Sequence, residues 1–158
     1  MTVTVTVKDR GAKRARALLK QPRKELWVGV LEKEGAKTHP SGETIGTIAW
    51  WMEKGFYAGD AWVAPRSWLF DWLDENEKKI ARQLWADTYR VLFGEPPESE
   101  TKALSKRGAV YKRQIQQRIA AVPGNWAELK PDTIRKKGHA YPLIDTTTFI
   151  NAIRYEVR

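Results

Sequence analysis

Histidine and cysteine, the side chains most often used for zinc binding and nucleophilic catalysis, are nearly absent from this chain. Its two histidines, His39 and His139, are separated by a hundred positions, and cysteine is absent. Thiol catalysis, disulfides and thiolate zinc sites are therefore excluded. A catalytic zinc ion needs three close ligands, and no His-Glu-x-x-His motif, phosphate-binding glycine loop or dinucleotide fingerprint occurs. We expect neither a metal site nor a cofactor.

Two catalytic arrangements can be drawn from the other polar residues, and neither has its supporting motif. A serine triad would have to combine three distant residues: Ser41, His139 and Asp145. The Gly-x-Ser-x-Gly turn that exposes such a nucleophile is missing. Glu53 and Asp60 flank an aromatic segment, as the two carboxylates of a glycosidase flank a sugar. Glu53 can instead form hydrogen bonds near the C-terminal end of its own helix, or pair with Arg66. We therefore expect that this protein is not an enzyme.

Tryptophan is unusually abundant, with eight in 158 residues. Trp68 and Trp72 lie four positions apart on a predicted helix, so at least one of them belongs to the core. Trp50 and Trp51 point about 100° apart, and one monomer cannot easily bury both. A large core can explain the set, but tryptophan is also favoured at the centres of interfaces. We expect a subunit or neighbour interface formed by these residues: Trp50, Trp51, Glu53, Phe56, Tyr57, Trp62 and Arg66.

The net charge of +9 is distributed unevenly along the chain. Residues 1–24 carry +7, residues 25–101 carry −6 and residues 102–158 carry +8. Segments of opposite charge allow complementarity between copies as well as attraction to phosphate, although solvated helix faces explain them too. The possible contacts to phosphate or to a DNA-containing lumen are Arg107, Lys112, Arg113, Arg118, Arg135, Lys136 and Lys137. No motif for reading base sequence accompanies them, so contact with nucleic acid would be non-specific.

The spacing of apolar residues predicts helices and strands along the whole chain. An alternation of valine with threonine predicts an N-terminal strand that contains Val3, Val5 and Val7. The strongest helices are predicted over 66–93 and from Ser99 or Thr101 to Ala121, the second ending at Val122-Pro123-Gly124. The other predicted elements are a basic helix over 12–20, strands over 26–31 and 153–157, helices over 43–54 and 131–137, and loops over 34–42 and 55–65.

The two long helices are predicted to separate a core face from a charged face. The apolar face of the first comprises Leu69, Trp72, Leu73, Ile80, Leu84, Thr88, Val91 and Leu92, with Asp87 among the solvent-facing charges. The second turns Ala103, Leu104, Tyr111, Ile115 and Ile119 inward. Ser41 is the predicted N-cap of the helix over 43–54, and Asp145 is the predicted cap of a short turn before the last strand.

These elements predict an α+β fold, with a small, mainly antiparallel sheet of three or four strands packed against two long and two or more short helices. The length suits one domain over 1–158, in which 1–24 form a basic N-terminal strand and helix. No apolar run approaches the roughly 18 residues of a membrane helix. The first residues lack the basic start and apolar core of a secretory signal. We expect a soluble protein made in the cytoplasm, with no membrane partner.

Four segments follow a further pattern, in order along the chain. They are Val28-Gly29-Val30, the A-x-x-x-E-x-G run that ends at Gly55, Pro65-Arg66-Ser67-Trp68-Leu69, and a closing stretch. The closing stretch runs from Trp126 through Leu129-Lys130-Pro131-Asp132-Thr133-Ile134 to Pro142-Leu143-Ile144-Asp145-Thr146. Together they resemble the tail-completion (tail-terminator) proteins of long-tailed double-stranded DNA bacteriophages. Two positions depart from that family's pattern, because Ser67 replaces an expected proline and Thr147 an expected glycine.

The resemblance implies a structural virion protein without a reaction. Proteins of that family form a ring, usually a hexamer, at the head-proximal end of the tail tube, where the ring ends tail polymerisation. The implied partners are further copies of the chain, the tail-tube protein, a head-closure or connector protein, and genomic DNA in the lumen. The implied location is the neck of the virion, after synthesis in the host cytoplasm. Two alternatives stay open: another neck component, such as a head-closure or connector ring protein, or a non-specific nucleic-acid-binding protein.

Overall fold

The computed structural model describes residues 10–22, 24–94, 96, 98–138 and 147–158. The predicted strand at Val3, Val5 and Val7, the histidine His139 and the predicted cap Asp145 lie outside these residues. Within the described part the fold is α+β, as predicted, with two long helices and four short strands. The strands form two separate antiparallel pairs rather than one sheet, β1 with β4 and β2 with β3.

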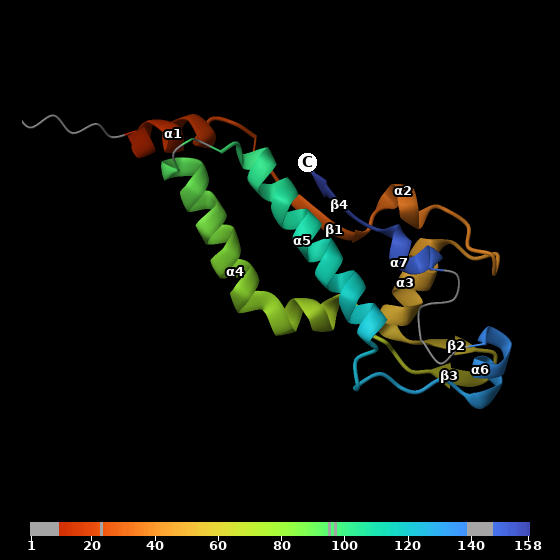
Figure 1. Ribbon diagram of the computed structural model, residues 1–158. Helices are drawn as coiled ribbons and strands as arrows, with labels where there is room; N and C mark the ends of the chain where they lie inside the picture. The colour runs from red at the N-terminus through yellow and green to blue at the C-terminus, as the bar shows by residue number, and fades with distance from the viewer. Residues whose placement is uncertain (1–9, 23, 95, 97, 139–146) are drawn as a thin grey trace, which may run out of the picture.

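The two long helices lie side by side, the β1–β4 pair runs along α5, and most of the other elements lie at the two ends of the molecule (Figure 1). Helix α1 crosses one end of α4, while α3, α6, α7 and the β2–β3 pair lie at the other end of the molecule. The elements in chain order are α1 (Arg10–Leu19), β1 (Leu26–Val30), α2 (Glu32–Gly35), α3 (Ile45–Lys54), β2 (Phe56–Ala58), β3 (Ala61–Val63), α4 (Phe70–Phe93), α5 (Glu100–Ala121), α6 (Pro131–Lys137), α7 (Thr148–Ala152) and β4 (Ile153–Val157).

Helix α5 packs across the β1–β4 pair and forms the centre of the core. Ile115 and Ile119 of α5 and Ile153 of β4 are fully buried. Gly108 allows the close approach, because a Cβ atom there would come within 2.5 Å of the Tyr155 ring and 2.8 Å of Leu26. The predicted inward face of this helix is confirmed at Ala103, Tyr111, Ile115 and Ile119, which are all buried.

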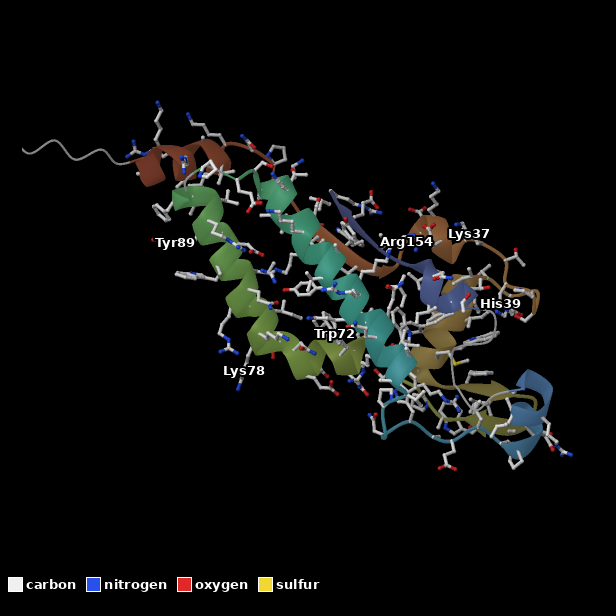
Figure 2. All side chains as sticks on the ribbon, viewed as in Figure 1. Lys37, His39, Trp72, Lys78, Tyr89 and Arg154 are labelled. Atoms are coloured by element: carbon white, nitrogen blue, oxygen red, sulfur yellow. The ribbon has the colours of Figure 1, made fainter. Side chains whose placement is uncertain are left out.

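Helix α4 buries a narrower face than its pattern predicts. Trp72 packs edge-on against Tyr111 with ring centroids 5.5 Å apart, and it lies between α4 and α5 in Figure 2. Leu73 and Thr88, both predicted to face the core, are exposed. Asp87, predicted to face solvent, is buried because α5 places a guanidinium opposite it. The prediction for these three residues was wrong, because it used only the polarity pattern along α4 and took no account of where α5 packs.

The segment predicted as a loop over 55–65 is a β-hairpin. Tyr57 pairs with Trp62 and Phe56 with Val63, and the turn places Gly59 at a φ of 62° before Asp60. A two-residue Gly-Asp turn suits the twist of a hairpin, because glycine adopts positive φ without steric cost. The run of aromatic residues is therefore a pair of short strands.

The N-cap of α3 differs from the prediction, whereas the end of α5 agrees with it. Thr44, not Ser41, caps α3, since its hydroxyl accepts a hydrogen bond from the Thr47 N–H at 3.1 Å. The first residues of the predicted loop over 34–42 belong instead to the short helix α2. Ser99 caps α5, and Val122, with a φ of 50°, ends it as expected.

Candidate interaction surfaces

Glu53, predicted to lie at an interface, is buried at the end of α3 and caps the start of α4. Its carboxylate accepts hydrogen bonds from the N–H groups of Trp68 (3.2 Å), Leu69 (3.2 Å) and Phe70 (2.9 Å), and from the hydroxyl of Ser67. The first N–H groups of a helix have no partner within the helix, and a negative charge there is favourable. Glu53 therefore joins two helices inside the chain and presents no surface to a neighbour.

Arg66, the other charged residue of the predicted interface, is also buried. Its N–H donates to the Met52 carbonyl at 2.6 Å, and its Nη2 donates to the Ala127 carbonyl at 3.2 Å. Burial lowers the pKa of the guanidinium. The expected pair with Glu53 does not form, because the oxygens of Glu53 are engaged by the start of α4. The structure thus corrects both assignments.

A cavity of about 640 Å³ lies beside Arg66, between α3, the hairpin and the segment before α6. Its walls are mainly apolar and include Ile48, Trp51, Met52, Phe56, Leu129 and Phe149. His39 also lines this cavity, whereas neither Glu53 nor Asp60 does. Asp60 instead occupies the exposed hairpin turn. The two carboxylates considered for a glycosidase therefore do not share a cavity in the described part of the chain.

The aromatic residues of the predicted interface divide into exposed and half-buried groups. Tyr57 and Trp62, which we call the hairpin patch, are 72% and 50% exposed, with ring centroids 5.0 Å apart. Trp50 is exposed as well, beneath the Lys54 ammonium. Trp51 and Phe56 are half-buried and stack on each other at 5.2 Å.

A second exposed aromatic surface lies on α4 and was not singled out from the sequence. Trp85, Tyr89 and Phe93, which we call the α4 stripe, are 70%, 52% and 50% exposed. They are spaced four residues apart, so they share one face of the helix, and neighbouring rings lie 5.8 and 4.9 Å apart. Figure 2 shows Tyr89 on the side of α4 turned away from α5. Aromatic residues at four-residue spacing outside the apolar face were the signal in the sequence.

Arg107, one of the predicted phosphate contacts, is engaged inside the protein. Its Nε and Nη2 atoms donate to the two carboxylate oxygens of Asp87 at 2.7 and 3.0 Å. Burial by itself raises the pKa of Asp87, but hydrogen bonds from Arg107 and Arg90 outweigh it, and the pKa lies below its ordinary value. The hydrogen bond to Asp87 raises the pKa of Arg107. This pair links α4 to α5.

The other predicted phosphate contacts differ in accessibility. Arg118 is largely covered and pairs with Glu75 and, at 3.7 Å, with Asp71. Arg113 is exposed and Lys112 half-buried, while Arg135 is exposed and pairs with Asp132. The side chains of Lys136 and Lys137 lie outside the described part of the structure. Arg107 and Arg118 are thus withdrawn from the candidate phosphate surface, and α5 presents fewer free cations than its sequence implies.

Comparisons with protein-family models, with curated proteins and with solved structures found no match for this chain. Among the described helices, none is long and apolar enough to cross a membrane. Over the same residues, no group of three or more His, Asp or Glu side chains is placed to hold a metal ion. A functional proposal therefore depends on the exposed surfaces and on the sequence pattern.

Proposed function

We propose that this chain is a structural protein of a bacteriophage virion, which forms a ring at the head-proximal end of the tail, terminates the tail tube and joins it to the head connector. The observation that carries this proposal is the pair of exposed aromatic surfaces, the hairpin patch and the α4 stripe, at opposite ends of the molecule (Figure 1). Contiguous exposed apolar surface commonly marks a contact with another protein. A ring needs two different faces on each copy, because its contacts run head to tail.

The local structure at one of the two departures from the tail-completion pattern supports the same proposal. Thr147 replaces the expected glycine, and its φ of 58° lies in the left-handed region that glycine adopts readily. Ser67 replaces the expected proline, and its hydroxyl accepts a hydrogen bond from the Asp71 N–H at 3.2 Å at the start of α4. One departure thus retains a backbone shape suited to the family's residue, and the other adds a helix cap.

The partners in this proposal are further copies of the chain, the tail-tube protein and a head-closure or connector protein. Genomic DNA in the lumen is a fourth partner, without sequence specificity. Exposed cations on α5 and α6, such as Arg113 and Arg135, would contribute to that contact. Because Arg107 and Arg118 are engaged by carboxylates, a role centred on nucleic-acid binding has less support than assembly.

The proposal is tested by measuring the mass of the full chain by light scattering at increasing concentration, alone and with the tail-tube protein of the same virus. We expect ring-sized particles or capped tube ends, and labelled copies at the head–tail junction in electron micrographs. A chain that stays monomeric under both conditions would contradict the proposal. Salt-dependent retention of that monomer on DNA would favour the nucleic-acid-binding alternative instead.

A further inference from the structure

Of the three rings of the α4 stripe, only Phe93 packs against another element in the described part of the chain. A Cβ atom on Gly11 of α1 would lie 1.9 Å from the Phe93 ring, so this ring is seated directly over α1. The Tyr89 ring stacks on Trp85, contacts Phe93 and faces away from α5 (Figure 2), and Trp85 is largely exposed. Two large rings held side by side on a regular helix form a preorganised apolar surface, which binds at a low cost in side-chain entropy.

Positive charges border the α4 stripe. Lys78 and Arg82 precede Trp85 on α4, and neither pairs with a carboxylate among the residues that the structure describes. Figure 2 shows Lys78 on the same side of the helix as Tyr89. From Lys78 to the end of α4 the one acidic residue is Asp87, which is buried against α5. The exposed surface around the stripe is therefore aromatic and basic.

The tip of the hairpin carries a negative charge, although the exposed Lys130 lines the cavity on its inner side. Asp60, at the turn, is the one charged residue between Phe56 and Val63, and no cation pairs with it in the described structure. Tyr57 and Trp62 lie on the same face of the hairpin because they are directly opposed across the strands. The hairpin therefore ends in an exposed aromatic pair beside an unpaired carboxylate.

We propose that the α4 stripe of one copy receives the β2–β3 hairpin of the next copy. The aromatic pair of the hairpin packs on Trp85 and Tyr89, and Asp60 pairs with Lys78 or Arg82. The two surfaces lie at opposite ends of the molecule (Figure 1), so no copy can satisfy both by itself, and the contact propagates from copy to copy. This inference rests on the proposed function and specifies the surfaces that would close the ring.

Disulfide trapping tests the contact, because the chain contains no cysteine of its own. A chain with Ala61→Cys beside the hairpin turn is mixed with a chain with Ala81→Cys, one helical turn before Trp85. Both positions are exposed, as is Ala120 on α5, where Ala120→Cys serves as the control. The mixture is oxidised mildly, alone and on the tail-tube protein, and cross-linked dimers are separated on gels. We expect the mixed dimer of positions 61 and 81 to predominate.

The inference would be overturned if most dimers were joined through two copies of position 81 or through two copies of position 61. It would also be overturned if the mixed dimer of positions 61 and 81 were no more abundant than the mixed dimer formed with Ala120→Cys. Oligomers or capped tubes without the mixed dimer would refute this contact and leave the proposed function standing. Absence of oligomers, capped tubes and mixed dimer together would refute both.

Charge exchange provides a second readout that does not depend on the core. Asp60→Lys in the chain with Ala61→Cys should lower the yield of the mixed dimer. Arg82→Asp in the chain with Ala81→Cys should restore it, because the charge pair across the contact is then inverted. Trp85→Ala should weaken association by about 30-fold, a typical loss for an aromatic residue at the centre of an interface. Failure of the exchange to restore the yield, or unchanged association of Trp85→Ala, would contradict the assigned contacts. Circular dichroism checks that each variant keeps its helix content.

Discussion

The carboxylate of Glu53 lies 2.9 Å from the backbone N–H of Phe70, so the last turn of α3 caps the first turn of α4. The two residues are 17 positions apart and are separated by the hairpin. Because the carboxylate also receives two neighbouring N–H groups, it fixes the direction in which α4 leaves α3. Glu53 is thus a residue of the fold rather than of the surface.

Replacing Glu53 should destabilise the monomer. We expect Glu53→Ala to lower the free energy of unfolding by about 3 kcal/mol, because several N–H groups lose a charged acceptor. Glu53→Gln should cost less, since it keeps one carbonyl oxygen. Glu43→Ala, at an exposed position, should change the value by about 0.5 kcal/mol or less. Urea unfolding measures all three, and an unchanged Glu53→Ala monomer that fails to assemble would restore the interface assignment.

The ion pair between Asp87 and Arg107 should make stability depend on pH in the acid range. The folded pKa of Asp87 lies below its ordinary value of 3.8, so the pair contributes fully above that value and loses its contribution as pH falls through the folded pKa. At neutral pH, Asp87→Asn should cost about 3 kcal/mol, because it leaves the Arg107 guanidinium without its counter-charge. The difference in free energy of unfolding between Asp87→Asn and the wild type should shrink as pH falls below about 4.

Thermal unfolding between neutral and acid pH checks this prediction. Arg90→Ala is the matched control, because Arg90 is the exposed partner of the same carboxylate and should contribute at most about 1 kcal/mol. If Asp87→Asn and the wild type differed in stability by the same amount at every pH, the charge of Asp87 would not be the source of the stabilisation.

Gly108 should not tolerate a methyl group, although alanine is the better helix former. The Cβ atom of Gly108→Ala would meet the Tyr155 ring at 2.5 Å, so α5 would have to move away from β4. We expect a loss of about 2 kcal/mol by overpacking, which exceeds the gain of about 1 kcal/mol in helix propensity. Gly124→Ala, where a Cβ atom meets nothing within 4 Å, is the control and should be close to neutral. Denaturant midpoints distinguish the two, and equal midpoints would refute the close packing.

Thr147→Gly should stabilise the protein. A β-branched residue at a φ of 58° is strained, and glycine removes a cost of 1–2 kcal/mol, less its own entropy loss on folding, which leaves a gain of about 1 kcal/mol. Thr101→Gly, within α5, should instead lower stability by about 1 kcal/mol. A rise in melting temperature for Thr147→Gly, with a fall for Thr101→Gly, supports the prediction. A fall for both would mean that the Asn151 hydrogen bond to the Thr147 hydroxyl contributes more than the backbone strain costs.

The long helices could be predicted because their signals are local. In α5 the four-residue spacing of Tyr111, Ile115 and Ile119, with Ser99 before it and Pro123 after it, indicates both the buried face and the ends. The hairpin was missed, although Gly59-Asp60 is a suitable turn, because its strands are three residues long and two residues of each are exposed. Short strands carry too few alternations for a period of two to be evident.

The charged residues were harder to predict, because their roles depend on groups far away in the chain. Asp87 was grouped with solvent-facing charges, yet Arg107, 20 positions later, pairs with it inside the helix pair. Glu53 and Arg66 lie close in sequence and carry opposite charges, but each is engaged elsewhere. A charge pattern indicates which ion pairs are possible. It does not indicate which of them form in the folded protein.

By itself, the sequence determined the α+β class, the positions of the two long helices and the absence of cysteine chemistry. These properties follow from composition and from periodicities within one element, where the interacting groups are a few residues apart. Tertiary structure alone decided which polar groups are internal and which aromatic rings stay exposed. Burial is a relation between elements: α5 covers Asp87 and leaves Trp85 uncovered on the same helix, because it packs against only one side of α4.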